Sequence, residues 1–463
     1  MAQPAVRRQE WRRGTLRACA TSICRMLTSS ARRDRRNRLS YRIMWDASEM
    51  RLRGLWRDPD FLKLWAGQTV SQVGSWITLV GLPLTAVLLL GASPLQMGIL
   101  SGASAAAILL FGLFAGAWAD RLRRRPILIW ADLGRAAVLV TIPVAVVFHR
   151  LTMSHLYLVA AASAILTVFF DVSYQAYLPS LIGAENILEG NSKMTLTESI
   201  AGVVGPALTG ALVQAITAPV AILFDAVSFL VSALSVWLIR KPEARPKPGV
   251  APHIGHEIVE GLQASWRDPI LRVLLLRTAT SSVFLGFGGS LYFLFAIREL
   301  KLGAMLLSAV IAVGGASSVF GALVAERLVR RIGVGHTLIG CALLIGVAAV
   351  LPPLARGPVA VCASILAVAQ LGDMAWSIYS INELSLRQAI APNHVLGRVN
   401  SAMHLMFRGV LPVGALLGGA LAEIIGLRNA MFIGAAGFLL STLWLILSPV
   451  RRLREFPAAA TVG

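Results

Sequence analysis

Residues 116–125 read Gly-Ala-Trp-Ala-Asp-Arg-Leu-Arg-Arg-Arg and join two long apolar runs, at 95–118 and 126–148. A similar stretch, Ala-Glu-Arg-Leu-Val-Arg-Arg, occupies residues 325–331 and also lies between two apolar runs. The same short basic segment therefore occurs twice, in the same setting. This indicates an internal repeat.

Two further pairs of segments repeat in the same order and at nearly the same separation. Trp-Arg-Asp-Pro occurs at 56–59 and again at 266–269, each time just before an apolar run. A third pair is formed by Asn191, Gly205, Gly210, Ala211 and Leu212 and by Asn400, Gly414, Gly419, Ala420 and Leu421. Three matches in one register predict two parallel halves of the same architecture.

The composition is that of a membrane protein. Apolar residues make up 56% of the 463 residues, charged residues only 14%, and the mean hydropathy is +0.70. Soluble domains typically contain about 25% charged residues. Runs long enough to cross about 30 Å of hydrocarbon lie at 62–90, 95–118, 126–148, 155–178, 196–216, 219–239, 271–297, 304–325, 336–354, 358–382, 402–425 and 429–448. The sequence predicts an all-α membrane protein with twelve transmembrane helices in two pseudo-symmetric six-helix bundles.

The net charge of +20 is concentrated in an Arg-rich start and in alternate short loops. If both termini are cytoplasmic, the outer loops hold only Arg150, Arg298, Lys301, Arg356 and Arg428. This asymmetry follows the positive-inside rule. We therefore expect a multi-pass protein of the bacterial inner membrane with both termini in the cytoplasm, and a lipid bilayer rather than nucleic acid as its partner.

The expected organisation has five parts. They are an Arg-rich cytoplasmic tail at 1–54, a six-helix half at 55–239, a Pro-rich and Arg-rich linker at 240–265, a second half at 266–450, and a cytoplasmic tail at 451–463. The favoured interpretation of the first tail is that translation starts later, at Met44 or Met50; the alternative is binding of acidic lipid or nucleic acid. The four cysteines follow no metal or disulfide spacing.

The loop at 116–125 carries a resemblance to a known family. Its residues Gly116, Asp120, Arg121, Arg124 and Arg125 match the G-x-x-x-D-R-x-G-R-R signature of the major facilitator superfamily, with Arg123 in place of the second Gly. The chain resembles that family from about residue 55 to residue 450. The resemblance implies that these five residues, with Glu326 and Arg327 of the second copy, act as a conformational latch at the cytoplasmic end.

Shorter motifs resemble one branch of this family. Phe170-Asp171, Leu178-Pro179, Gly205-Pro206 and the stretch 225–229 are similar to bacterial enterobactin exporters and macrolide efflux pumps. Proton-coupled export is implied by this resemblance.

Charged residues inside the apolar runs are candidates for function, because each costs about 2.5–3.5 kcal/mol on membrane insertion scales. Three acidic residues, Asp171, Glu198 and Asp373, are candidates for proton coupling. Arg135, Arg277 and Arg408 are candidates for buried charge partners. Two interpretations stay open: the carboxylates exchange protons or bind a cationic group, or they form ion pairs with these arginines and hold a gate.

Polar residues in three runs recur at helical spacing, so that each set shares one face. The candidates for lining a cavity are Gln68, Gln72 and Trp76, then Tyr174 and Gln175, then Gln370 and Ser377. The family resemblance places helices 1, 4, 7 and 10 around a central cavity, which agrees with this assignment. The alternative is that these side chains form hydrogen bonds between helices, worth about 0.6 kcal/mol each in a membrane bundle.

The expected function is secondary active transport, most simply proton-coupled efflux of a drug, antibiotic or siderophore. An importer of a small metabolite on the same fold is the alternative, and a membrane sensor or enzyme without transport is an alternative of another class. The sequence contains no phosphate-binding G-x-x-x-x-G-K-[ST] loop and no H-E-x-x-H motif. We therefore expect no enzymatic activity, no cofactor and no metal, with protons and a small molecule as partners of a functional monomer.

Overall fold

The computed structural model describes residues 54–119, 122–243, 254–392 and 395–457. The chain divides into two units, residues 1–57 and 58–463. In the first unit the described residues contain one short 3₁₀ turn, η2 (Leu55–Arg57). The second unit contains all the long helices of the described chain.

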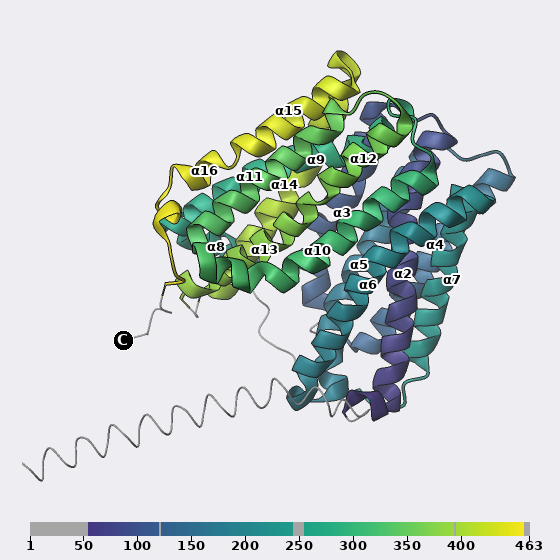
Figure 1. Cartoon of the computed structure of the whole chain (residues 1–463). Helices are drawn as coiled ribbons and strands as arrows, with labels where there is room; N and C mark the ends of the chain where they lie inside the picture. The colour runs from purple at the N-terminus through teal and green to yellow at the C-terminus, as the bar shows by residue number, and fades with distance from the viewer. Residues whose placement is uncertain (1–53, 120–121, 244–253, 393–394, 458–463) are drawn as a thin grey trace, which may run out of the picture. The chain divides into compact units, whose positions relative to one another are not determined.

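Each half of the second unit contributes six membrane-spanning segments (Figure 1). The N-terminal half consists of α2 (Pro59–Leu88), α3 (Pro94–Ala119), α4 (Arg124–Val147), α5 (Met153–Ile182), the turn η3 (Ala184–Asn186), α6 (Ile187–Ile216) and α7 (Ala218–Trp237). The C-terminal half consists of α8 (Ile254–Arg267), α9 (Pro269–Arg298), α10 (Ala304–Ile332), α11 (Val334–Leu354), α12 (Val359–Gln370), α13 (Gly372–Ile390), α14 (Leu396–Ile425), α15 (Leu427–Leu440), α16 (Leu443–Ile446) and η4 (Pro449–Arg452).

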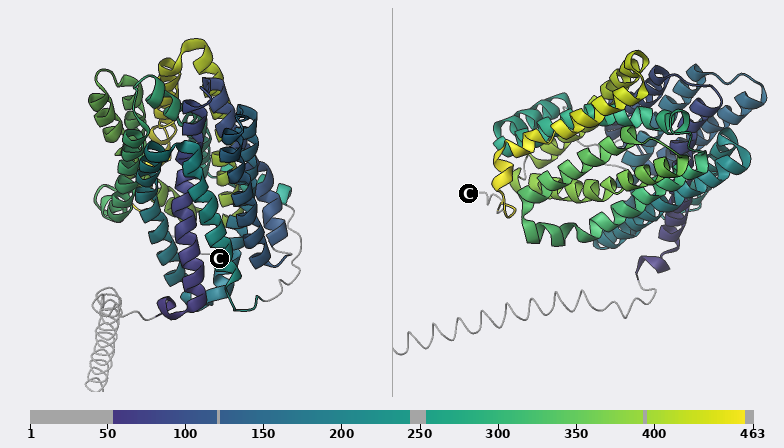
Figure 2. Two further views of the ribbon diagram at one scale, coloured as in Figure 1. Left: turned by 90° about the vertical axis from the view of Figure 1, so that its right-hand side faces the viewer. Right: turned by 45° about the horizontal axis from the view of Figure 1, so that its top comes forward.

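The predicted fold class is confirmed. Among the described residues, 12 helical segments are long and apolar enough to cross a membrane, and α12 and α13 together make one of them. Helices α2 and α7 pack side by side in the first half, as do α9 and α14 in the second (Figures 1 and 2).

The repeated Trp-Arg-Asp-Pro segments start the first span of each half. The carboxylate of Asp58 accepts hydrogen bonds from the backbone N–H groups of Asp60 (2.9 Å) and Phe61 (3.1 Å). The carboxylate of Asp268 accepts in the same way from Ile270 (2.8 Å) and Leu271 (2.9 Å). An Asp at the N-cap satisfies free N–H groups of the first turn, and the Pro after it suits the first helical position. The repeat is thus a helix start used twice.

Several helices continue beyond the apolar runs that predicted them. Helix α6 begins at Ile187 rather than 196, and α10 continues to Ile332 rather than ending at 325. Hydropathy marks where the hydrocarbon ends, whereas backbone hydrogen bonds extend a helix into polar surroundings. Glu326 and Arg327 therefore lie within α10 and not in a loop.

The tenth span is broken, which hydropathy did not indicate. Helix α12 ends at Gln370, and α13 begins at Gly372. At the break, the N–H of Leu371 bonds to the carbonyl of Val368 (3.1 Å). The hydroxyl of Ser317 in α10 donates to the carbonyl of Gln370 (2.8 Å), so a neighbouring helix satisfies a backbone group that the break sets free.

The expected linker at 240–265 contains more structure than its composition suggests. Residues 244–253 lie outside the described residues, and α8 forms immediately after them. Helix α8 packs on α14: Glu260 forms an ion pair with Arg398, and Gly261 lies against the backbone of Arg398. The second part of the linker is therefore a helix docked on the C-terminal half.

The two halves meet near one end of their helices. We call the end that carries the starts of α2 and α9 the basic face, and the other end the opposite face. Near the opposite face, Gly98 of α3 contacts Ala415 and Gly419 of α14, and Gly210 of α6 contacts Ser308 of α10. The absence of side chains at these glycines lets the helix backbones approach closely.

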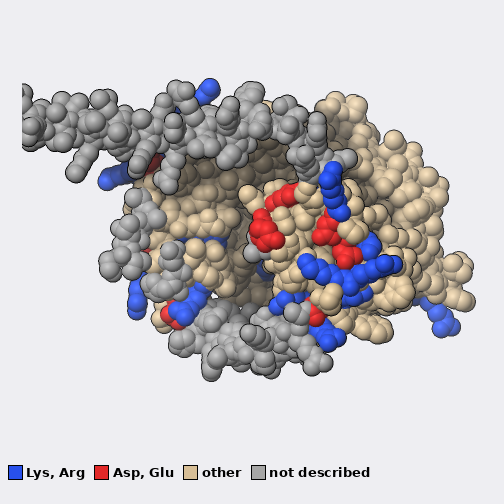
Figure 3. All heavy atoms as spheres, turned by 90° about the horizontal axis from the view of Figure 1, so that it is seen from below, with Lys and Arg blue, Asp and Glu red and all other residues tan. Residues whose placement is uncertain are grey.

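The halves separate toward the basic face, which is hollowed and carries acidic and basic side chains (Figure 3). The opposite end of this space is filled by a buried apolar cluster that includes Ile77 and Leu84 of α2 with Leu291 and Phe295 of α9. The structure is therefore open at the basic face and closed at the opposite face.

Candidate functional site

One cavity of about 660 Å³ collects most of the polar candidates of the N-terminal half. It lies between α2, α5 and α6. Among the side chains that line it are Gln68, Gln72, Trp76, Asp171, Tyr174, Gln175 and Glu198. Residues spaced by three or four positions share a helix face, which is why α2 and α5 each present several of these groups to one space.

Two carboxylates line this cavity. Asp171 of α5 and Glu198 of α6 are both exposed side chains, and in the described part of the chain neither forms an ion pair within 4.0 Å. Arg135 and Arg408 act on Asp171 electrostatically from a greater distance. The cavity thus contains two acidic groups that have no direct counter-ion among the described residues.

Arg135 instead forms an ion pair with Asp132, one turn earlier on α4. Its guanidinium carbon lies 4.4 Å from the centre of the Phe170 ring and 4.0 Å from that of Phe229. Cation–π contacts of this kind contribute about 2 kcal/mol when desolvated. Arg135 is therefore held by aromatic rings and by its own helix, with its side chain almost entirely buried.

Glycine and serine contacts fix the α2 side of the cavity. A Cβ atom on Gly205 of α6 would lie 2.5 Å from the Cβ of Trp76, so the glycine provides the space that the indole occupies. The amide of Gln68 donates to the hydroxyl of Ser232 in α7 (3.2 Å). Gln68 therefore lines the cavity and also joins two helices.

A second cavity, of about 580 Å³, shares Gln72 and Trp76 with the first and includes Asp225 of α7. Asp225 is 1% exposed and accepts hydrogen bonds from Thr78 of α2 and from Ser228 (3.0 Å). The bond from Thr78 ties α2 to α7, and both bonds give Asp225 the partners that Asp171 lacks among the described residues.

The candidates of the C-terminal half lie elsewhere. Gln370 and Asp373 line a separate cavity of about 230 Å³ between α9, α11, α12, α13 and α15. Ser377 shares a hydrogen bond with Ser318 of α10 (2.7 Å). Arg277 is 2% exposed, with its guanidinium carbon 3.9 Å from the centre of the Tyr379 ring. The structure therefore does not bring these residues into the cavity that contains Asp171 and Glu198.

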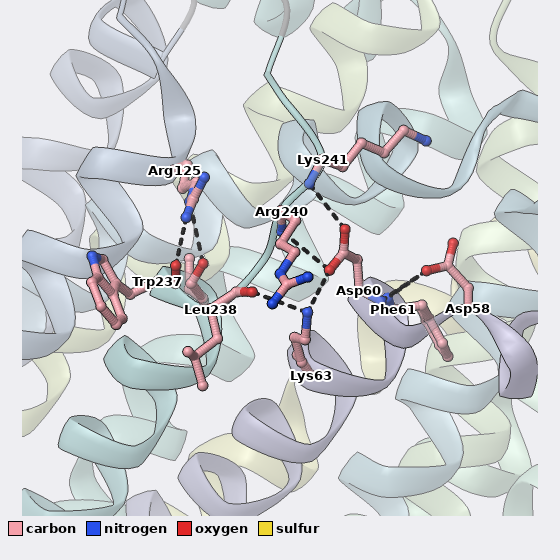
Figure 4. Close-up of polar contacts among 10 residues, drawn as sticks. Asp58, Asp60, Phe61, Lys63, Arg125, Trp237, Leu238, Arg240 and Lys241 are labelled. Atoms are coloured by element: carbon pink, nitrogen blue, oxygen red, sulfur yellow. Dashed lines mark hydrogen bonds and ion pairs between the residues drawn. The ribbon is translucent and has the colours of Figure 1, made fainter.

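The first copy of the latch motif lies at the basic face. Gly116 is in α3, and Asp120 and Arg121 lie outside the described residues. The backbone N–H groups of Arg124 and Arg125 donate to the carboxylate of Glu243, at 2.7 and 3.1 Å. The guanidinium of Arg125 donates to the last carbonyls of α7, Val236 (3.2 Å) and Trp237 (2.6 Å; Figure 4). Arg125 thus caps the end of α7.

Asp60 organises the other side of this cluster (Figure 4). Its carboxylate accepts from the backbone N–H groups of Arg240 (3.1 Å) and Lys241 (2.9 Å), and from the ammonium of Lys63 (2.8 Å). Lys63 also donates to the carbonyl of Leu238 (3.0 Å). The sequence analysis did not identify Asp60 or Glu243. The feature that could have indicated them is an isolated acidic residue beside a basic helix end.

The comparisons with known proteins agree with this geometry. Residues 64–412 match the family described as Major Facilitator Superfamily. The chain belongs to this superfamily. This confirms the resemblance that the sequence motifs indicated, and it makes the chain a multi-pass membrane transporter.

Relatives of this transporter include efflux pumps. The multidrug efflux pump Tap of Mycolicibacterium fortuitum is 27% identical over 420 residues, which cover 87% of this chain and 98% of the relative. Macrolide efflux protein A of Streptococcus pyogenes is 26% identical over 220 residues, covering 47% of this chain and 53% of the relative. The crystal structure of the nucleoside transporter NupG covers 84% of this chain and 98% of its own, with a TM-score of 0.71 at 10% identity, a likeness of fold.

The second copy of the latch motif is arranged differently in this transporter. Glu326 pairs with Arg330 on the same helix (2.5 Å), and both side chains are about three-quarters exposed, at 76% and 77%. Beside them the C-terminal segment crosses the start of α11. The N–H groups of Val334 and Gly335 donate to the carbonyls of Arg454 (3.2 Å) and Leu453 (2.8 Å).

Proposed function

We propose that this transporter is an exporter that exchanges a small amphipathic molecule, such as a drug, antibiotic or siderophore, for protons. It works as a monomer in the bacterial cell membrane, with its basic face and both termini in the cytoplasm. The observation that carries the proposal is the placement of Asp171 and Glu198 in one cavity, each without an ion-pair partner among the described residues.

Two negative charges in the same cavity repel each other, and a proton or a positively charged group relieves that repulsion. Acidic residues inside a membrane bundle commonly mark a proton or substrate pathway. Asp171 is the better candidate for the proton, because it lies on α5 among apolar residues and beside Tyr174 and Gln175, which provide polar contacts for a substrate.

The open basic face supports a first step at that face. The structure is open at the basic face, and the excess of Lys and Arg at this face supports its placement in the cytoplasm. In this state the substrate enters from the cytoplasm and Asp171 releases a proton there. When the halves rock and open at the opposite face, the substrate leaves and Asp171 is protonated again. The efflux pumps among the relatives support export rather than import.

The test compares Asp171→Asn with the parent in proteoliposomes. The substrate is a compound identified by a susceptibility screen of a deletion strain against drugs, antibiotics and siderophores. We expect Asp171→Asn to lose uphill transport driven by a pH gradient by at least about tenfold, the effect of roughly 1.4 kcal/mol. Exchange of labelled for unlabelled substrate without a gradient should persist, because that exchange requires no release or uptake of a proton at this position.

Glu185→Gln is the matched control, since Glu185 is an exposed acid in η3 that does not line the cavity. It should pump like the parent. If Asp171→Asn still pumps uphill with the parent's pH dependence, the proton site is not Asp171, and Glu198 becomes the residue to examine. If cells that carry the parent protein accumulate the compound instead of expelling it, the direction of transport is import.

A further inference from the structure

A large hollow at the basic face of the C-terminal half belongs neither to the substrate cavity nor to the Asp60 cluster. It has a volume of about 920 Å³ and lies between the end of α10, the start of α11, α13 and the C-terminal segment. We call it the Arg454 hollow. The side chains that line it include Arg330, Arg331, His336 and Arg454.

The charges of the Arg454 hollow are only partly neutralised. Glu326 pairs with Arg330, and Glu455 is the other acid that lines the space. Within the described ranges, neither Arg331 nor Arg454 has an ion pair or a side-chain hydrogen bond. Two guanidinium groups therefore face the hollow with a single carboxylate to offset them, which leaves it positive.

Backbone contacts hold Arg454 in place. The carbonyls of Arg454 and Leu453 accept from Val334 and Gly335, at 3.2 and 2.8 Å. Gly333 adopts a φ of 87°, which L side chains rarely take, and this turn brings the chain from α10 into α11 beside the C-terminal segment. The backbone at Arg454 is thus held by the fold.

Apolar side chains line the same hollow. Ile332 at the end of α10, Ile381 within α13 and Phe456 in the C-terminal segment are 47%, 42% and 37% exposed, although they line the same space as the arginines. Exposed apolar groups next to cations fit an amphipathic ligand with an anionic head. A free phosphate would use only the arginines and would leave these apolar side chains in water.

We propose that the Arg454 hollow binds an acidic phospholipid such as phosphatidylglycerol or cardiolipin. The phosphate contacts Arg331 and Arg454, and an acyl chain follows Ile332 and Ile381. Basic pockets at the cytoplasmic ends of transmembrane helices are suited to such headgroups. The proposal concerns a site on the C-terminal half and does not depend on the transported substrate.

The test measures lipid binding to the full chain by native mass spectrometry and by thermal unfolding in nanodiscs. Nanodiscs of phosphatidylethanolamine are compared with nanodiscs that also contain phosphatidylglycerol or cardiolipin. We expect acidic lipid to bind in preference and to raise the unfolding temperature. Arg331→Gln with Arg454→Gln should weaken that binding roughly 30-fold, the effect of two arginines at a membrane surface.

Two controls make the result specific. Arg150→Gln with Arg356→Gln removes the same charge at the opposite face and should leave lipid binding unchanged. Arg331→Lys with Arg454→Lys keeps the charge and should retain the preference for acidic lipid. An unfolding temperature of the glutamine variant equal to that of the parent in phosphatidylethanolamine nanodiscs would show that the glutamine variant is folded.

Three results would overturn the proposal. The first is equal binding of acidic and zwitterionic lipid by the parent protein. The second is an equal loss of binding in the glutamine variant and in the opposite-face control. The third is competition by glycerol 1-phosphate at the same concentration as the lipid, which would make the hollow a site for a free phosphate. Weaker lipid binding by Ile332→Ser than by the parent protein would support the acyl contact.

Discussion

Replacing Gly98 by valine should prevent the two halves from closing at the opposite face. A Cβ atom at this position would lie 2.5 Å from the carbonyl oxygen of Ala415 and 3.3 Å from the Cα of Gly419, both in α14. Neither is the end of a flexible side chain, so the added carbon can be accommodated only if α3 and α14 move apart. That movement opens the contact that closes the opposite face.

The expected shift of the equilibrium between the two conformations follows from the cost of overpacking the interface. Extra carbons in a well-packed interface cost about 1–3 kcal/mol. This clash is present only in the conformation that is closed at the opposite face, so the whole cost acts on the equilibrium between conformations. A difference of about 1–3 kcal/mol corresponds to roughly a 5- to 150-fold change in their ratio.

The measurement is the distance between spin labels on the opposite-face ends of α3 and α14, in the parent and in Gly98→Val. The variant should shift the population toward long distances. Gly340→Val is the control, because a Cβ on Gly340 of α11 would meet no atom of the described chain within 4 Å. An unchanged distance distribution in Gly98→Val would show that this glycine does not set the closure.

Two further predictions concern helix ends. Asp268→Ala removes the N-cap of α9 and should destabilise the protein by about 1 kcal/mol, which is measured as a lower unfolding temperature in detergent. Asp268→Asn should retain most of the stability. An equal loss of stability in both variants would mean that capping is not the cause. Arg125→Gln removes two hydrogen bonds to the end of α7 and should cost about 1–2 kcal/mol, measured in the same way, with the exposed Arg327→Gln expected to have little effect.

The fold was largely predictable because its signals are local or periodic. Apolar length identifies a membrane span without knowledge of its neighbours, and the repeat at 56–59 and 266–269 records a helix start that each half needs. The end of α10 and the break after Gln370 were not predictable in this way. Both depend on backbone hydrogen bonds, and at Gln370 the partner is Ser317, which is distant in sequence.

The candidate site was predictable within a helix and less so between helices. Spacing on α2 and α5 grouped Gln72, Trp76 and Tyr174 on inward faces, and the structure places them in one cavity. The spacing of residues along one helix does not indicate which face of another helix packs against it. It could not show that Glu198 shares this cavity with Asp171 while Asp373 lies in another.

The pairing of charges was the least predictable part. Arg135 was one of three arginines that the sequence offered as a partner for a distant acid, in one of two open interpretations, and its ion pair in the structure is with Asp132 on the same helix. Asp132 and Arg135 have the usual spacing of an ion pair within a helix. Whether Arg135 pairs with Asp132 or with Asp171, however, depends on where Phe170 and Phe229 place its guanidinium group. The role of Glu243 likewise depends on how the chain leaves α7, which composition does not encode.

The break between α12 and α13 makes the two halves mechanically unequal. Helix α5 is the counterpart of this span in the first half. It is continuous from Met153 to Ile182, so a displacement of one end tilts the whole helix. The tenth span is jointed at Leu371. Leu371 keeps helical dihedral angles, and hydrogen bonds of the i to i−3 type span the break, from Leu371 to Val368 and from Met374 to Leu371, so this span has a defined point of bending that α5 lacks. The two halves of the fold, built on one repeat, therefore differ in where their central helices can bend.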